Sequence, residues 1–379
     1  MNIKRVIAIF TAVLLLTACV TTRPEESPAT RALVPLEAVL VTDAPQFGAG
    51  TGSHSDVDGD GIHNVLALSS GGAEGAYGAG VMKGWTETGT RPEFDVVSGV
   101  STGALIAVLA FLGPEYDDEL ERFYTETRAR DVYRIRGPLS VLSDSLLDNS
   151  PLKASIEAVV TRELLDKVAA EHRKGRRLYV ATTNLDAGDL VIWDMGDVAL
   201  GGRSNDVQFF QKILRASAAI PGLFPPVYIK PVRGIQKRQA HVDGGLKAPV
   251  LIGDYMFPAD AKSSNLYVVI NDFTTRLNDS TPIRASLLSI ARKSIAELMR
   301  ELLEETVFRG FVLSRQIGAE FYLTSIPQTV EMSDQSLNFD PERNRKLFEA
   351  GRKAGQAGAD TWHRSPPRAN NREKRLASN

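Results

Sequence analysis

The sequence predicts an α/β fold, a three-layer α/β/α domain around a mostly parallel central sheet. Short apolar runs alternate with helical segments from the start of the folded part. The first four segments are a strand at 65–68, a helix at 75–87, a strand at 94–98, and a turn and helix at 99–112. Strands and helices that alternate at this spacing favour a parallel sheet covered by helices.

Each predicted element has a local cause. The first strand, Val65–Leu68, is apolar throughout and runs into Ser and Gly, as a buried strand does before a tight loop. Small residues in the helix at 75–87 allow close packing, and Gly113-Pro114 stops the helix that follows the second strand. The later predicted elements are a helix starting at Ser150-Pro151, strands at 178–181 and 190–193 paired through the turn at 186–189, a helix at 207–218, strands at 240–243 and 266–270, an amphipathic helix at 283–308 and a last helix opening at Asp340-Pro341.

The first nineteen residues have the layout of a bacterial secretory signal. Lys4 and Arg5 precede an apolar run at 6–16 that is too short to cross a bilayer as a mature helix. The run ends in Leu-Thr-Ala followed by Cys19, which resembles a lipobox and makes Cys19 a lipidation site. Cys19 is the only cysteine, so a disulfide is excluded. Since Val20 follows it, the expected location is the cell envelope, lipid-anchored at the outer membrane.

Gly99-Val100-Ser101-Thr102-Gly103 matches the G-x-S-x-G nucleophile elbow. The pentapeptide follows an apolar strand and opens a helix, which is the context that exposes a serine hydroxyl on a sharp turn. Flanking glycines are needed because side chains would collide in that turn. The pattern predicts a nucleophilic serine at Ser101.

Two further glycine-rich turns follow predicted strands. Ser69 to Gly80 presents backbone N–H groups to an anion, and the G-K-[ST] signature of a phosphate loop is absent. With a serine elbow downstream, an oxyanion of acyl transfer is the favoured anion. The turn His241-Val242-Asp243-Gly244-Gly245 places a carboxylate at the rim of the sheet, although an ordinary turn aspartate has the same pattern.

In this order, the three motifs resemble the patatin-like phospholipase family. The resemblance implies a Ser–Asp dyad with Ser101 as nucleophile and Asp243 as base, and an oxyanion hole formed by the amides around Gly71, Gly72 and Ala73. It also implies hydrolysis of membrane phospholipid or lysophospholipid acyl esters through an acyl-enzyme, with no cofactor. The sequence offers no His/Cys cluster with metal-ligand spacing, and no metal is expected.

The resemblance and the composition together give a domain division. We expect a signal peptide at 1–18, a flexible tether at 19–60, a patatin-like hydrolase domain at 61–355 and a basic disordered tail at 356–379. The chain has 44 basic and 46 acidic residues, and this balance gives no reason to expect nucleic acid as a partner.

Two features depart from the family pattern. The family loop reads G-G-G-x-[RK]-G, whereas here Ser70 replaces the first Gly and Glu74 replaces the basic residue. The segment after Asp-Gly-Gly is Leu-Lys-Ala-Pro, without the frequent Asn. The reversed charge at Glu74 leaves open a catalytically inactive, membrane-anchored lipid-binding or structural protein. A Ser–His esterase that uses His241 is the other alternative, because His241 lies two residues from Asp243 on the same strand face.

Overall fold

The computed structural model describes residues 40–41, 61–137, 140, 143–201, 205–230, 238–259, 261–274, 286–330 and 337–367. The expected signal peptide, Cys19, nearly all of the tether and the end of the basic tail therefore lie outside the described residues.

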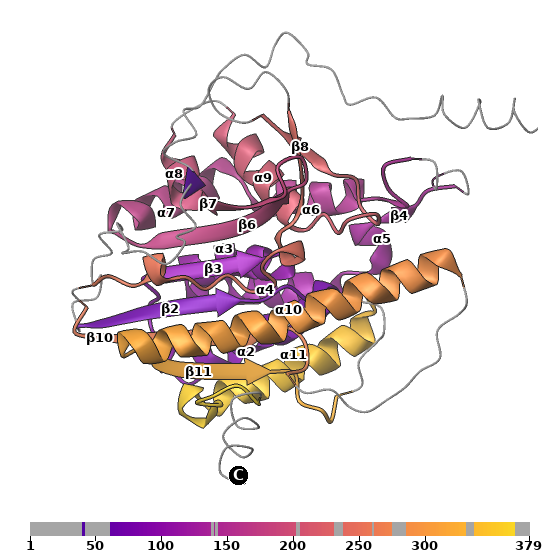
Figure 1. Ribbon diagram of the computed structural model, residues 1–379. Helices are drawn as coiled ribbons and strands as arrows, with labels where there is room; N and C mark the ends of the chain where they lie inside the picture. Colours follow the sequence, from indigo (N-terminus) through magenta and orange to yellow (C-terminus); the bar gives the residue numbers. More distant parts are fainter. Residues whose placement is uncertain are drawn as a thin grey trace, which may run out of the picture.

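A nine-stranded sheet forms the centre of the described part (Figure 1). Its neighbour order is β1-β7-β6-β3-β2-β10-β11, and β9 pairs with both β6 and β8. The strands are β1 Leu40–Val41, β2 Ile62–Leu68, β3 Val96–Val100, β6 Arg177–Asn184, β7 Asp189–Asp194, β8 Val227–Ile229, β9 Gln239–Asp243, β10 Ser263–Ile270 and β11 Glu320–Ser325. β6, β3, β2, β10 and β11 are parallel, whereas the other pairings are antiparallel. A short separate hairpin joins β4 Arg134–Ile135 to β5 Leu147–Asp148.

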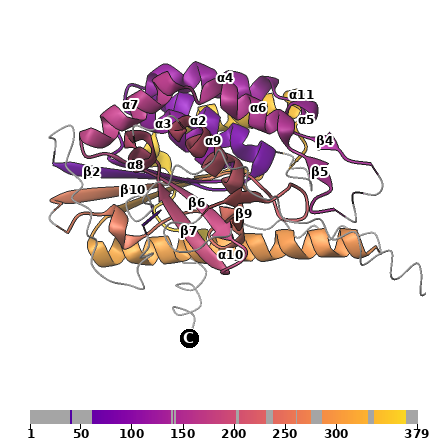
Figure 2. The ribbon, with the colours of Figure 1, turned by 90° about the horizontal axis from the view of Figure 1, so that it is seen from above.

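Helices cover both faces of the sheet, so the predicted three-layer α/β fold is confirmed. The helices are α2 Gly75–Glu87, α3 Thr102–Leu112, α4 Asp117–Glu126, α5 Ala129–Val132, α6 Ser150–Val159, α7 Arg162–Arg173, α8 Met195–Leu200, α9 Asp206–Ser217, α10 Leu287–Ile317 and α11 Pro341–Gln356. Figure 2 shows α10 alone along one face and α2, α3, α4, α6, α7 and α11 on the other. Among the described residues, no helix is long and apolar enough to cross a membrane.

The packing of β2 explains the apolar run 65–68 in its second half. Side chains alternate between the faces of a strand. Val65 and Ala67 pack in the core beneath α10, with Leu303 of that helix. Leu66 and Leu68 pack in the larger core beneath α2 and α3. Because both faces are covered, the four positions of this run are all apolar, whereas the first half of the strand includes the polar residues His63 and Asn64.

Helices α2 and α11 touch backbone to backbone at glycines. A Cβ atom added to Gly80 or Gly84 of α2 would lie 2.0 Å from the carbonyl oxygen of Phe348 or Arg352. A Cβ atom on Gly351 of α11 would lie 2.0 Å from the carbonyl oxygen of Tyr77. Only glycine permits so close an approach, and α11 is thereby held against the helix that opens from the glycine-rich turn.

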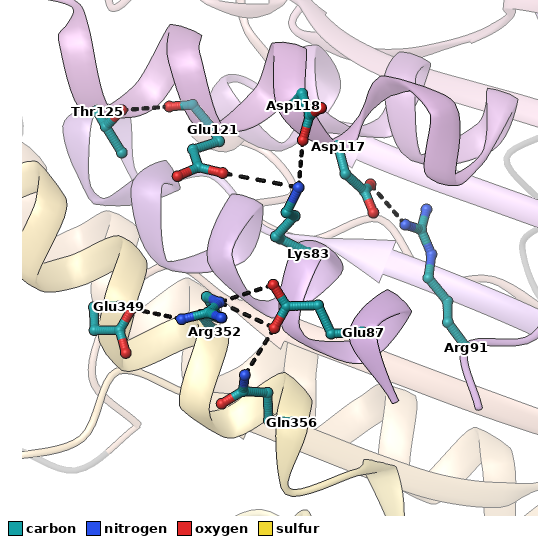
Figure 3. Close-up of polar contacts among 10 residues, drawn as sticks. All are labelled: Lys83, Glu87, Arg91, Asp117, Asp118, Glu121, Thr125, Glu349, Arg352 and Gln356. Atoms are coloured by element: carbon teal, nitrogen blue, oxygen red, sulfur yellow. Dashed lines mark hydrogen bonds and ion pairs between the residues drawn. The ribbon is translucent and has the colours of Figure 1, made fainter. Parts of the chain in front are cut away.

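Charged side chains rim the α2–α11 contact (Figure 3). Arg352 of α11 donates to both carboxylate oxygens of Glu87, at 2.9 and 3.0 Å. On the other side of α2, Lys83 pairs with Asp118 and Glu121 of α4. Exposed pairs of this kind contribute little individually, so the glycine contact sets the spacing of the helices and the ion pairs border it.

Two expected boundaries are corrected. The helix expected to end at residue 308 continues to Ile317, because Gly310 fits within the helix against Ile252 and the left-handed Gly318 (φ 73°) ends it. The folded part also continues past residue 355, since the buried Trp362 packs against Trp85 with ring centroids 4.9 Å apart. A large indole that covers apolar surface explains why this segment joins the domain.

Candidate active site

Ser101 lies at the sharp turn between β3 and α3, as the sequence predicts. Its φ of 57° is the only positive φ of a non-glycine residue in the described part of the chain. A Cβ atom on Gly99 would lie 2.2 Å from the Gly103 carbonyl oxygen, and one on Gly103 would lie 2.4 Å from that of Leu68. Such strained geometry persists only where the surroundings enforce it, and it is common at catalytic residues.

Ser217 supports the elbow from beneath. Its hydroxyl accepts a hydrogen bond from the Ser101 amide at 2.9 Å and donates to the Ala181 carbonyl of β6 at 2.7 Å. Ser217 is fully buried at the end of α9. This positioning residue was not predicted from the sequence.

Asp243 ends β9 and meets Ser101. The Ser101 hydroxyl hydrogen-bonds the Asp243 carboxylate, whose Oδ1 also accepts from the Gly245 amide at 2.7 Å. The Asp243 amide donates to the Ala219 carbonyl at 2.9 Å. Burial raises the pKa of Asp243 to about 6, and the hydrogen bonds from Ser101 and Gly245 oppose this rise. The carboxylate is thus a stronger base than an exposed aspartate, yet ionised at neutral pH.

The glycine-rich turn lies beside the elbow. Gly72 has φ 63° and begins the short 3-10 helix η3 Gly72–Glu74, which leads into α2. The first amides of a helix have no partner within it, so Gly72 and Ala73 present donors at this end. A Cβ atom on Gly75 would lie 2.2 Å from Thr102 Oγ1, which places the turn directly against the start of α3.

The Asp-Gly-Gly turn meets both of the other motifs. A Cβ atom on Gly244 would lie 3.1 Å from Cγ1 of the elbow residue Val100, and one on Gly245 would lie 3.4 Å from Ser70 Cβ. The Ser70 amide also donates to the Pro249 carbonyl at 2.7 Å. The three predicted motifs therefore come together at one edge of the sheet.

Asn271 anchors the glycine-rich turn and was not predicted. Its Nδ2 donates to the Ser69 carbonyl at 2.9 Å, and its Oδ1 accepts from the Gly78 amide of α2 at 3.0 Å. A Cβ atom on Gly71 would lie 2.5 Å from the Asn271 carbonyl oxygen. A polar residue directly after the strand at 266–270 was the available signal, because carboxyl ends of parallel strands share an edge.

Glu74, at the usually basic loop position, pairs with an arginine from α11. Arg343 Nη2 lies 2.5 Å from Glu74 Oε1, and both side chains are largely buried. Burial raises the pKa of Glu74 to about 7, whereas the Arg343 charge and hydrogen bond lower it. The contact joins residues 269 positions apart, so no local pattern could reveal it.

The hydrogen-bond partner of His241 is Thr182, not the elbow serine Ser101. Its Nδ1 lies 2.9 Å from Thr182 Oγ1, which also accepts from the Trp193 indole at 2.8 Å. Burial lowers the pKa of His241 to about 4, so the ring is neutral at pH 7. The imidazole packs between these side chains, while the Ser101 hydroxyl bonds to Asp243.

One group with metal-ligand side chains lies away from the elbow. His172 Nε2 lies 3.0 Å from Asp197 Oδ1, and His172 Nδ1 lies 3.5 Å from Asp194 Oδ1. One ligand atom from each of His172, Asp194 and Asp197 lies within 4.8 Å of the other two. Asp194 pairs with Tyr179 near the start of β6, at the end of the sheet opposite Ser101. No ligand spacing along the chain indicates this group, because its members meet only in three dimensions.

Comparison with known proteins adds family evidence to this geometry. The family model described as Patatin-like phospholipase matches residues 66–254. A segment of 70 residues is 47% identical to the cUMP-AMP-activated phospholipase of Escherichia coli, covering 18% of this chain and 22% of that protein. The chain thus aligns with about a fifth of the length of this relative.

Solved structures with partial similarity include two bacterial proteins. VipD from Legionella pneumophila is 13% identical, with a TM-score of 0.41 over 79% of this chain and 67% of that chain. ExoU from Pseudomonas aeruginosa, in complex with SpcU, is 14% identical, with a TM-score of 0.30 over 78% and 52% of the respective chains. The matched family model spans the glycine-rich turn, the serine elbow and the Asp-Gly-Gly turn. This chain belongs to the patatin-like phospholipase family.

Proposed function

We propose that the chain hydrolyses carboxyl esters of membrane lipids, phospholipid or lysophospholipid acyl chains, through a Ser101–Asp243 dyad. The observation that carries the proposal is the hydrogen bond between the Ser101 hydroxyl and the buried Asp243 carboxylate at a strained elbow. The family match supports the substrate class.

The reaction proceeds in two acyl transfers. Ser101 Oγ attacks the ester carbonyl carbon while its proton passes to Asp243, and the carbonyl oxygen gains charge beside the amides of Gly72 and Ala73. The bond to the leaving alcohol breaks, and Asp243 gives its proton to that oxygen. Water then attacks the acyl-enzyme, loses a proton to Asp243 and releases the fatty acid, and the proton returns to Ser101.

The buried environment supports this chemistry. A carboxylate with a pKa near 4 is a weak base for an alcohol, and burial raises the pKa of Asp243 to about 6. Arg343 supplies positive charge behind the turn in which Glu74 stands, so the reversed charge of the loop is compensated from α11.

A fluorophosphonate probe tests the nucleophile directly. We expect the chain beginning at Val20, which retains every described residue, to gain one covalent phosphonyl group on the peptide that contains Ser101. The same chain should hydrolyse a p-nitrophenyl ester and a lysophospholipid. The Ser101→Ala variant should remain unlabelled. A wild-type chain that folds, stays unlabelled and turns over neither ester would refute the hydrolase and favour the lipid-binding alternative.

We further propose that residues 1–18 form a signal peptide and that acylated Cys19 attaches the protein to the outer membrane through the tether at 19–60. Several acyl chains on one residue hold a protein firmly to a bilayer. We expect Cys19→Ser to move the expressed protein from the membrane to the soluble fraction, measured by fractionation at high salt. Retention of the variant in the washed membrane fraction would contradict lipid anchoring.

A further inference from the structure

Large exposed apolar side chains are concentrated on one side of the domain. Leu298 of α10 is 71% exposed and Ile135 of β4 is 83% exposed. The other exposed large apolar residues in the described part are Leu185, Ile290, Ile295, Val312 and Ile317. Val312 and Ile317 lie at the far end of α10. The first half of α10 and the β4–β5 hairpin both lie toward the right of Figure 1 and Figure 2, on different layers of the domain.

The first half of α10 contacts the Asp-Gly-Gly turn and extends from there to this side of the domain. A Cβ atom on Gly245 would lie 3.0 Å from Met299 Cε, so the helix contacts the turn next to Asp243. Arg300 Nη2 lies 3.8 Å from Asp272 Oδ1, which ties the same helical turn to the end of β10. Leu298 directly precedes Met299 in the same helical turn and is exposed to solvent.

The β4–β5 hairpin lies on the same side and is hydrogen-bonded to the segment that follows α9. The amides of Leu146 and Leu147 donate to the Gly222 and Leu223 carbonyls, at 3.2 and 2.9 Å. Gly222 and Leu223 follow shortly after Ala219, whose carbonyl oxygen accepts a hydrogen bond from the Asp243 amide. The backbone that positions Asp243 thus also positions the hairpin that carries Ile135.

The charges near Ile135 indicate what could cover this side. Arg128, Arg130 and Arg134 are exposed in the same segment; Arg130 Nε lies 3.9 Å from Asp131 Oδ1, and Arg136 pairs with Asp144 at 3.0 Å. Asp131 is the acidic residue of the segment 128–136, and Asp148 lies opposite Arg134 in the β4–β5 pair. An apolar tip among arginines suits the interface of an anionic bilayer, where the side chain enters the headgroup region and the guanidinium groups meet phosphates.

We propose that this side of the domain, with Leu298 and Ile135 as its apolar contacts and Arg134 as a charged contact, docks on an anionic lipid bilayer. The inference rests on the proposed function, because docking here would bring the Ser101–Asp243 edge to the acyl esters. Single exposed apolar residues are ordinary on protein surfaces. Here the two elements that carry Leu298 and Ile135 each contact backbone next to the catalytic residues, and this is the reason to assign this side to lipid.

Vesicle sedimentation tests the docking without catalysis. The chain beginning at Val20 with Ser101→Ala is mixed with vesicles of phosphatidylcholine alone or with added phosphatidylglycerol. We expect tighter binding to the anionic vesicles, weakened by salt. Leu298→Ser and Ile135→Ser should each weaken it about tenfold, since a buried leucine-sized side chain contributes at least that factor. Arg134→Gln should weaken binding to the anionic vesicles alone.

Val312→Ser is the matched control, because it removes an exposed apolar residue from the same helix at its far end. It should bind vesicles as the parent does. Equal binding by the parent, Leu298→Ser and Ile135→Ser would overturn the proposal. A dimer in solution that Leu298→Ser dissociates would also overturn it, since a second copy would then cover this side. Hydrolysis of the water-soluble p-nitrophenyl ester by wild type separates failure of the proposed function from failure of docking.

Discussion

Replacing Asp243 with asparagine is expected to lower kcat/KM for ester hydrolysis by about a thousandfold or more, as is replacing Ser101 with alanine. Asparagine keeps the shape of the side chain but cannot accept the serine proton at neutral pH. His241→Ala should retain most of the activity, because His241 bonds to Thr182 while the Ser101 hydroxyl bonds to Asp243. Hydrolysis of a p-nitrophenyl ester by the chain beginning at Val20 measures all three variants.

The melting temperature provides the control for folding. Burial raises the pKa of Asp243 to about 6, so the folded state loses stability as pH rises from about 4 to about 6, and the whole loss is present above that. Asparagine carries no charge, and Asp243→Asn should therefore melt at or above the wild-type temperature at pH 8. A folded His241→Ala variant without activity would reverse the assignment and establish a Ser–His mechanism.

The same carboxylate should set the pH profile. The base must be ionised, so log kcat/KM is expected to rise with pH below about 6 and to level off above it. An exposed aspartate would place this rise about two pH units lower. A flat profile from pH 4 to 8 would exclude Asp243 as the titrating base.

The parts of the site that could be predicted from the sequence are the short motifs of consecutive residues. Gly99 to Gly103 and Asp243 to Gly245 depend on local strand and turn geometry, so their patterns reveal them. The contact between Ser101 and Asp243 was implied by the family resemblance, whereas its geometry depends on β9 lying antiparallel beside β6. A pairing between strands this far apart has no local signature.

The supporting residues could not be found in the same way. Ser217 and Asn271 look like ordinary polar residues in sequence, and each acquires its role by meeting a backbone group of another element. The helix expected at 283–308 continues to Ile317, and Gly310 lies inside it, where the missing side chain makes room for Ile252. Tertiary packing overrides the local preference in this case.

Glu74 is understandable only in the folded chain. In the sequence it reverses a usually basic position and leaves catalysis in question. In the structure, Arg343 brings a positive charge to the same place from α11, and the glycine contact between α2 and α11 sets the distance. The basic group of the turn is thus supplied by a helix near the end of the chain.

Arg343→Met is accordingly expected to reduce both stability and kcat. It would leave the buried Glu74 without its partner, a loss that costs about 3–5 kcal/mol for a buried pair. Since η3 carries Glu74 along with the Gly72 and Ala73 amides, a shift of this turn should lower kcat about ten- to a hundredfold. KM should change less, because Arg343 supports the turn and is not proposed to contact substrate.

A double-mutant cycle separates the pair from general damage. Adding Glu74→Gln to Arg343→Met removes the unpaired carboxyl, and we expect it to restore most of the melting temperature. Arg345→Met, on an exposed position of the same helix, should leave melting and kcat at wild-type values. Thermal melts and kcat measured well below the melting temperature test the cycle. If Arg343→Met melts and turns over ester like Arg345→Met, the ion pair does not hold the oxyanion turn, and the reversed charge at Glu74 needs another explanation.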